Sequence, residues 1–139
     1  MLIGEYDYAI DEKGRLNFPA KFREEMGGTF IVTRWLEECL IAFPKSKWEE
    51  VFSALMASGL AAGRVARRFL LSGAVEVTPD KQGRILIPQA LRDHAGLVKE
   101  VSILGSDPYV EIWDTEAWRR ECAKMSNDEI AQAMEKLGI

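Results

Sequence analysis

The sequence contains only two cysteines and one histidine, which is little material for redox or metal chemistry. Cys39 and Cys122 form no Cys-x-x-Cys pair and are too few for a disulfide framework, so we expect both to be small buried hydrophobic residues. His94 has no Ser or Cys partner and no metal-ligand spacing around it. We therefore expect a protein that is not an enzyme and that uses no cofactor, metal ion or small-molecule substrate.

Long hydrophobic runs and an excess of basic charge are also missing. No window approaches the roughly 20 apolar residues of a membrane-spanning helix, and the start MLIGEYDYAI lacks the regions of a signal peptide. The formal net charge is -4 and the pI is about 5.1. We expect a cytoplasmic protein without membrane contact, in which any surface that binds nucleic acid has to be local.

One stretch of the chain occurs twice: DEKGRLNFPAKFR (11–23) returns as DKQGRILIPQALR (80–92). An offset of 69 aligns six pairs of residues: Asp11 and Asp80, Gly14 and Gly83, Arg15 and Arg84, Pro19 and Pro88, Arg23 and Arg92, Gly27 and Gly96. An offset of 70 then aligns Phe43 with Trp113 and Trp48 with Trp118. The duplication therefore covers most of the chain.

Each copy predicts the same series of elements. Alternating residues such as Tyr6 and Tyr8, or Val75 and Val77, predict a half-buried strand. The following D-x-x-G turn predicts a short hairpin with a return strand, because Asp bonds its own backbone and Gly accepts a positive φ. A proline then begins a short helix, which a glycine ends. A second apolar hairpin follows over 30–43 and 100–113.

Serine and acidic residues mark the starts of the remaining helices. Ser46, Asp114 or Thr115, and Ser126 are predicted N-caps. We expect a single α+β domain over 1–139, in which two pseudo-two-fold halves interdigitate into one closed barrel. Its expected parts are repeat one (about 1–56), a linker helix (about 60–71), repeat two (about 72–125) and a C-terminal helix (about 126–138).

The pattern D-x-x-G-R, followed by a short apolar strand, Pro and then L/F-R, resembles the swapped-hairpin DNA-binding domains of AbrB and SpoVT type. Two such patterns, in register over nearly the whole chain, resemble the bacterial MraZ family. The resemblance implies a double-split β-barrel whose halves form a pseudo-dimer, and it implies assembly into rings. It maps the family motif onto Asp11, Arg15, Asp80 and Arg84.

The same resemblance implies a function. MraZ-like proteins are transcriptional regulators that bind double-stranded DNA at repeated G-rich boxes upstream of their own gene. That gene lies in the cluster for division and cell-wall synthesis. A protein of this kind is expected to be associated with the nucleoid.

The chemistry of the repeated turn supports a role for its arginines. Turn geometry accounts for Asp and Gly but does not require Arg15 or Arg84. A guanidinium matches O6 and N7 of guanine in the major groove, which admits a two-stranded β-ribbon. Our hypothesis is that both arginines contact guanine or adjacent phosphates while Asp11 and Asp80 orient them. The alternative is a salt bridge in a surface turn.

Basic residues near the two turns are candidates for phosphate contacts, which fix register without reading sequence. They are Lys13, Lys21 and Arg23 near the first turn and Lys81 and Arg92 near the second, with Arg34 as a further candidate. A solvated surface explains each of them equally well. Arg64, Arg67 and Arg68 lie on the predicted linker helix, whose apolar residues favour an interface rather than DNA contact.

Two other functions are open from the sequence. The first is an antitoxin-like protein-binding module of the same superfamily, although two turns per chain and a capped helical end count against it. The second is a structural ring that binds no DNA. The aromatic residues Trp35, Trp48, Trp113 and Trp118 are expected in a core or subunit interface rather than stacked on bases.

Overall fold

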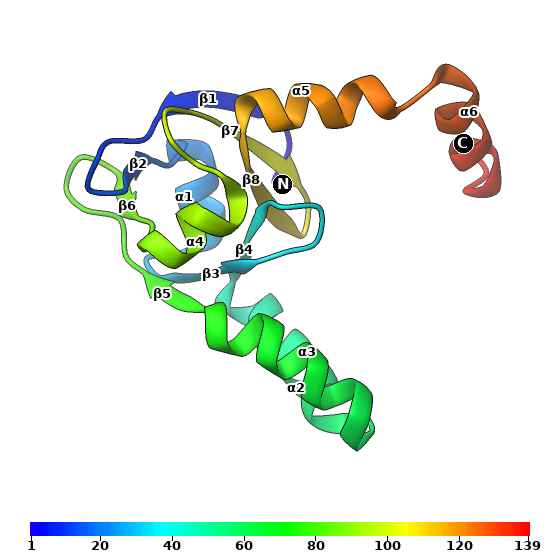
Figure 1. Ribbon diagram of the computed structural model, residues 1–139, viewed down its shortest axis with the longest axis horizontal. Helices are drawn as coiled ribbons and strands as arrows, with labels where there is room; N and C mark the ends of the chain where they lie inside the picture. The colour runs from blue at the N-terminus through cyan, green and yellow to red at the C-terminus, as the bar shows by residue number, and fades with distance from the viewer.

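The computed structural model describes all residues, 1–139, as eight strands and six helices (Figure 1). In chain order the elements are β1 (Glu5–Ala9), β2 (Arg15–Asn17), α1 (Ala20–Met26), β3 (Phe30–Arg34), β4 (Leu40–Pro44), α2 (Lys45–Ala57), α3 (Leu60–Gly73), β5 (Val75–Val77), β6 (Arg84–Leu86), α4 (Gln89–Ala95), β7 (Glu100–Ser106), β8 (Tyr109–Asp114), α5 (Thr115–Lys124) and α6 (Asn127–Lys136). The expected α+β composition is therefore confirmed.

The strands of the two repeats are interleaved. Six of them form an antiparallel sheet in the order β1-β7-β8-β4-β3-β5, and β2 pairs with β6 in a separate two-stranded ribbon, called the ribbon below. Strand β1 of the first repeat pairs with β7 of the second, and β5 of the second pairs with β3 of the first. The predicted interdigitation of the halves is thus confirmed by strand register.

Two strand pairs are symmetric between the repeats. In the ribbon, Leu16 lies opposite Ile85, its equivalent at the offset of 69. In the large sheet, Ile41 of β4 lies opposite Glu111 of β8, its equivalent at the offset of 70. Equivalent residues that face each other mark the centres of two-fold relationships, so the duplication read from the sequence is also a spatial one.

The predicted hairpin between the first two strands of each repeat is only partly correct. The chain does reverse, because Asp11 N–H donates to the Arg15 carbonyl at 3.1 Å and Asp80 N–H to the Arg84 carbonyl at 2.8 Å. Beyond that turn the first repeat has a single bridge, Ile10 to Leu16, and β2 pairs with β6 instead of β1. The predicted reversal is therefore confirmed, while the main partner of each return strand comes from the other repeat.

A core of 20 buried residues fills the space between the ribbon, the large sheet and the short helices α1 and α4. Phe22 of α1 and Leu91 of α4, which occupy equivalent places, are 1% and 2% exposed. Burying a side chain of this size stabilises the fold by about 1.5–3 kcal/mol. The core therefore fixes both short helices beneath the ribbon.

Most helix boundaries follow the predicted signals. Prolines 19 and 88 precede α1 and α4, and Gly96 ends α4 in the left-handed conformation. Asp114 caps α5 by accepting from Ala117 N–H, and Ser126 caps α6 by accepting from Glu129 N–H. The predicted cap at Ser46 is wrong: the N-cap is Pro44, two residues earlier, so α2 begins at Lys45 and has no side-chain cap.

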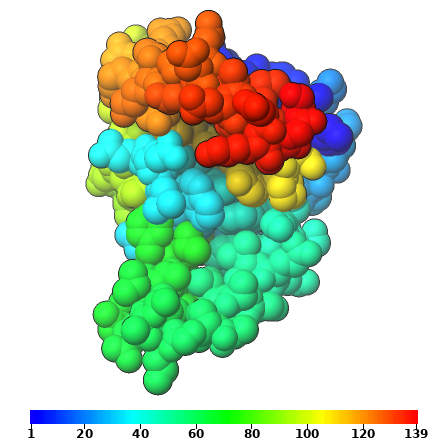
Figure 2. All heavy atoms as spheres, turned by 90° about the vertical axis from the view of Figure 1, so that its right-hand side faces the viewer, coloured from blue at the N-terminus to red at the C-terminus, as the bar shows by residue number.

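The longer helices project from the sheets. In Figure 1, α2 and α3 run side by side as a helical hairpin below the body, while α5 leads away from it and α6 lies beyond the end of α5. Figure 2 shows the α2–α3 hairpin as a lobe that stands out from the rest of the chain. None of the helices combines the length and apolar character needed to cross a membrane.

The cysteines differ in their environments. Cys39 is buried beside Trp113, and burial raises the pKa of its thiol to about 12. Cys122 is exposed, so its predicted burial was wrong; it lies on the solvent side of α5. The tryptophans do pack against aromatic neighbours: the centroid distance is 5.4 Å for Trp113 and Trp118, and 5.8 Å for the equivalent Phe43 and Trp48.

Candidate nucleic-acid interface

The first D-x-x-G-R turn (11–15) holds its arginine through one carboxylate. Asp11 Oδ1 accepts from the backbone N–H groups of Lys13 at 3.0 Å and Arg15 at 2.8 Å. Its Oδ2 accepts from Arg15 Nε at 2.5 Å. The same aspartate therefore shapes the turn and orients the guanidinium that follows it.

The second turn (80–84) repeats this geometry. Asp80 Oδ1 accepts from the N–H groups of Gln82 and Arg84, both at 2.9 Å, and Oδ2 accepts from Arg84 Nε at 3.0 Å. In both turns, called the tips below, no hydrogen bond within the chain uses the Nη atoms of the arginine. Each tip therefore presents an oriented guanidinium whose outer donors are free for a ligand.

Hydrogen bonding keeps the two carboxylates ionised. The pKa values of Asp11 and Asp80 lie below the ordinary aspartate value, chiefly because the backbone N–H of Arg15 or Arg84 donates to the charged form. Desolvation opposes this effect, and the arginine side chains add to it. The pairs stay charged at neutral pH, which maintains the orientation of both guanidinium groups.

The ribbon places both arginines on one face. Leu16 and Ile85 point into the core and are at most 1% exposed. Their neighbours in each strand therefore point to the opposite face, because side chains alternate along a strand. That face carries Arg15 opposite Leu86 and Asn17 opposite Arg84.

Asn17 and Leu86 were missed by the sequence analysis. They are equivalent positions of the two repeats, and both are exposed. The alternation around the buried Leu16 and Ile85 was the available signal, but the pairing of β2 with β6, which brings Asn17 opposite Arg84, was not predicted. Each half of the ribbon face therefore pairs an arginine with a different residue: Arg15 lies opposite Leu86, and Arg84 lies opposite Asn17.

Arg23 and Arg92 brace the tips from the opposite repeat. Arg23 Nε donates to the Phe18 carbonyl at 3.0 Å, and its guanidinium lies against Gly83 of the second tip. Arg92 Nε donates to the Ile87 carbonyl at 2.9 Å and lies against Gly14 of the first tip. Both side chains are half-buried, so they have a structural role that the sequence analysis did not predict.

The tip glycines allow this close approach. Gly14 has a φ of 89°, and a Cβ atom there would collide with the Ile87 carbonyl and lie 2.8 Å from Arg92 Nε. The Gly14 carbonyl in turn accepts from Ile87 N–H at 2.8 Å. In the second tip, the Gly83 carbonyl likewise accepts from Phe18 N–H at 3.0 Å. Each tip is thereby joined to the return strand of the other repeat.

The remaining predicted basic residues divide into two groups. Three lysines are exposed and form no ion pair: Lys13 in the first tip, Lys81 in the second tip and Lys21 on α1. Arg34 is bound elsewhere, since its Nε donates to the Phe69 carbonyl and its Nη2 to the Arg68 carbonyl and to Ser72. Arg34 thus holds the C-terminal end of α3 and does not join the tips.

No group of three or more His, Cys, Asp or Glu residues is arranged to bind a metal ion. The two tips, the ribbon and the crossed arginines instead form one polar surface with two-fold character. Together with the exchanged strands, they define a duplicated α+β protein in which each repeat contributes one Asp–Arg turn to a shared ribbon.

Comparison with known proteins gives the family. The family model described as "MraZ protein, putative antitoxin-like" matches residues 1–68 and again residues 70–137. The chain is 48% identical to the transcriptional regulator MraZ of Caldicellulosiruptor saccharolyticus, with 100% of both chains covered. It is 45% identical to that of Oenococcus oeni, with 96% of both covered. The chain belongs to the MraZ family, which consists of transcriptional regulators and not of enzymes.

Proposed function

We propose that this protein is a DNA-binding transcriptional regulator that reads guanine with Arg15 and Arg84. The proposed targets are repeated G-rich boxes in the promoter of the division and cell-wall gene cluster that includes its own gene. The observation that carries the proposal is the pair of arginines on one exposed ribbon face, each oriented by an aspartate with its Nη atoms free. In this role the protein associates with the nucleoid.

The ribbon has suitable chemistry for the major groove. The groove admits a two-stranded ribbon, and two guanidinium donors match O6 and N7 of guanine. Because Asp11 and Asp80 already hold the arginines, less side-chain entropy is lost on binding. Preorganisation of this kind favours a base contact over a mobile phosphate contact.

Phosphate contacts are assigned to the flanking basic residues. Lys13, Lys21 and Lys81 are exposed and unpaired, so their ammonium groups are available to the DNA backbone. Arg23 and Arg92 retain nitrogens beyond those used in bracing and are proposed to contact phosphates at the edges of the ribbon. These contacts supply affinity and salt dependence, whereas the tips supply sequence preference.

We also propose that the exchanged halves form the double-split β-barrel implied by the family resemblance, and that the copies assemble into a ring. One chain with an overall charge of -4 has a limited basic surface. Several copies in one assembly engage repeated boxes together, and effective concentration then raises the overall affinity by a factor of about 10² or more. Repetition of the protein would match repetition of the DNA boxes.

The test measures binding to labelled DNA from upstream of the gene, at several salt concentrations and with random-sequence competitor. Arg15→Ala and Arg84→Ala are compared with Arg120→Ala, an exposed arginine of α5 outside the ribbon. Loss of a bidentate base contact, worth about 1–3 kcal/mol, should reduce the preference for promoter DNA roughly 5- to 150-fold. Arg120→Ala should bind like the wild type.

Substitution of the lysines separates base from phosphate contacts. Lys13→Ala and Lys81→Ala should weaken all DNA sequences alike and reduce the slope of log affinity against log salt by about one unit each. If the tip variants keep the wild-type preference, the assignment of base contacts is wrong. If the wild type shows no preference for promoter DNA, regulation through this ribbon is wrong and a protein partner becomes the better hypothesis.

A further inference from the structure

The outermost residues of the two tips differ in charge. In each tip the carbonyl of the aspartate accepts from the N–H of the glycine three positions later, at 3.0 Å from Gly14 and at 2.9 Å from Gly83. The two residues between them form the end of a β-turn, and all four are exposed. They are Glu12 and Lys13 in the first tip and Lys81 and Gln82 in the second. At the first of these positions, one repeat therefore has a carboxylate where the other has an ammonium group.

The Glu12 carboxylate is available to a ligand. The backbone of this residue is fixed from the other repeat, because the Glu12 carbonyl accepts from Arg92 Nη1 at 3.3 Å. Its side chain takes part in no ion pair within the chain, and neither does that of the neighbouring Lys13. The first tip thus presents a free carboxylate from a fixed position at its end.

A carboxylate at this position is unfavourable for contact with the DNA backbone alone. Two like charges about 4 Å apart repel each other by about 1 kcal/mol in water, and by more where water is excluded. The equivalent Lys81 is instead attracted to phosphate. Binding of the first tip to DNA is therefore favourable only if a hydrogen-bond donor on the DNA offsets the repulsion at Glu12.

The major-groove edge of a G·C pair supplies such a donor. Guanine offers O6 and N7 as acceptors, while cytosine offers its N4 amino group, from which a carboxylate accepts. Arg15 provides the donors for guanine, and Glu12, three residues earlier, provides the acceptor for cytosine. The second tip has no free carboxylate, because Asp80 already accepts from the backbone and side chain of Arg84.

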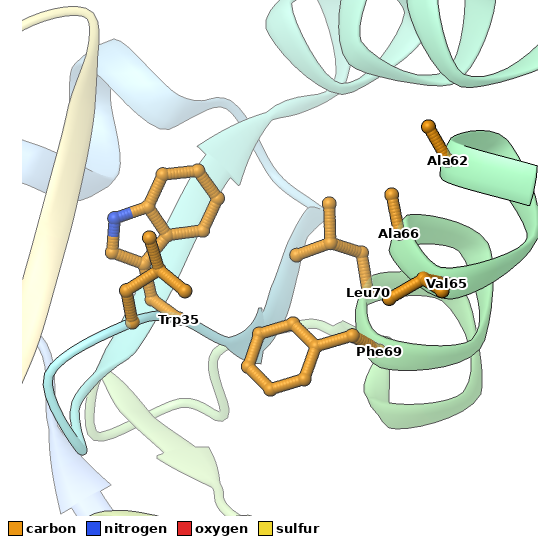
Figure 3. Close-up of a pocket in the computed structure, with 7 residues that line it drawn as sticks. Trp35, Ala62, Val65, Ala66, Phe69 and Leu70 are labelled. Carbon is orange, nitrogen blue, oxygen red and sulfur yellow. The ribbon is translucent and has the colours of Figure 1, made fainter. Parts of the chain in front are cut away.

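The most apolar exposed surface of the chain cannot make this contact. It is a groove between α3 and the turn that follows β3, lined by seven hydrophobic residues that include Trp35, Val65 and Phe69 (Figure 3). None of these side chains accepts a hydrogen bond from a base. In Figure 1, α3 also projects away from β2 and β6. Recognition of the cytosine amino group is therefore confined to the first tip.

We propose that Glu12 is a specificity residue that accepts from the N4 amino group of a cytosine beside the guanine bound by Arg15. The first tip then reads both strands of G·C-rich DNA, whereas the second tip reads guanine and holds phosphate through Lys81. Because the two tips are not interchangeable, each DNA box fixes one orientation of the chain. This inference rests on the proposed function and adds a base, a residue and a direction to it.

The experiment measures binding of the full chain to labelled promoter DNA in which the cytosines of one strand, and then of the other, are replaced by N4-methylcytosine. The methyl group takes the place of the amino hydrogen in the major groove and leaves the hydrogen that pairs with guanine. The wild type should lose affinity about fivefold for at least one of these duplexes. Glu12→Ala should bind the methylated and unmethylated duplexes equally.

Two comparisons separate base recognition from a general change of charge. Glu135→Ala removes an exposed, unpaired glutamate of α6, far from the ribbon in Figure 1, and should respond to methylation like the wild type. Glu12→Ala should bind random-sequence DNA up to about fivefold more tightly than the wild type, because one negative charge leaves the DNA-facing surface. Weaker binding of random DNA by Glu12→Ala would contradict this assignment.

The outcomes distinguish this inference from the proposed function. Equal losses of affinity on methylation in the wild type and in Glu12→Ala, or no loss in either, would overturn the inference. Promoter DNA with 7-deazaguanine, which lacks the N7 acceptor, tests the arginine contacts separately. A wild type that responds to 7-deazaguanine and ignores N4-methylcytosine leaves the proposed function intact and refutes the role of Glu12. A wild type without any preference for promoter DNA refutes both.

Discussion

Arg92 of the second repeat lies against Gly14 of the first, where a Cβ atom would come within 2.8 Å of its Nε. The arginine also donates to the Glu12 carbonyl at 3.3 Å, so it contacts the first tip at two points. Arg23 has the equivalent position against Gly83. Neither tip is therefore built by its own repeat alone.

Substitution of Gly14 by Ala should be far more damaging than the same change at Gly27. Both glycines have a positive φ, 89° and 88°, and Gly27 has a ψ of -178°, a conformation that essentially only glycine adopts, so each change carries a backbone strain of about 1–3 kcal/mol. Only at Gly14 does the new methyl group meet the Ile87 carbonyl and Arg92, which adds about 1–3 kcal/mol. Denaturant unfolding of the two variants measures the difference; equal losses of stability would show that the tip relaxes freely.

Arg92→Ala should lower stability, whereas Lys81→Ala should not. The Arg92 side chain donates to the Ile87 carbonyl at 2.9 Å, and a charge-assisted hydrogen bond contributes about 1.5–3 kcal/mol. Lys81 is exposed and unpaired, so its removal should change the free energy of unfolding by less than about 0.5 kcal/mol. Thermal unfolding at matched pH compares them. An Arg92→Ala chain as stable as the wild type would mean that the brace is dispensable.

The tips should lose order at acidic pH. Because the folded-state pKa of Asp11 is lowered, the ionised carboxylate stabilises the tip above its unfolded pKa, and this contribution disappears as pH falls through the folded pKa. Carboxyl carbon shifts in an NMR titration report that pKa directly. In Arg15→Ala the pKa of Asp11 should rise only part of the way to 3.8, because the backbone N–H of residue 15, the largest cause, is retained. A return to 3.8 would show that the guanidinium dominates.

Asn17 and Leu86 should give the two halves of the ribbon different base preferences. Asn pairs with N6 and N7 of adenine, while an apolar side chain suits the thymine methyl group, and a good pair discriminates by about 1–3 kcal/mol. If the ribbon binds DNA as proposed, Asn17→Leu should remove an adenine preference beside one guanine. The reciprocal Leu86→Asn should add an adenine preference beside the other guanine, at the position that the pseudo-two-fold axis relates to the first. Selection from randomised DNA measures both, and identical selected sites for all three chains would contradict the prediction.

Local features of this fold could be predicted from the sequence because they depend on neighbouring residues. The tip turns and the caps at Asp114 and Ser126 each result from contacts within a few positions. The predicted cap at Ser46 was wrong for a local reason as well. Pro44 already begins α2 with a suitable backbone conformation, so the serine falls inside the first turn.

Contacts between the repeats could not be predicted. Alternating burial shows that β2 has a buried face, but it does not say that its partner is β6. The crossing of Arg23 and Arg92 depends on that partner and was equally invisible. Asn17 was missed for the same reason, because only the pairing of β2 with β6 places it opposite Arg84 on the ribbon face. The sequence thus identified the arginines and aspartates of the tips, whereas their supports follow from three-dimensional exchange of strands.

The pairing of Leu16 with Ile85 also bears on how the surface can evolve. A homodimer of a single repeat would place the same residue on both sides of its two-fold axis, and every substitution would appear twice. Fusion of two repeats in one chain lets each side mutate independently, as Asn17 and Leu86 already have. The duplicated chain is consequently free to match a non-palindromic target while it keeps the architecture of a symmetric dimer.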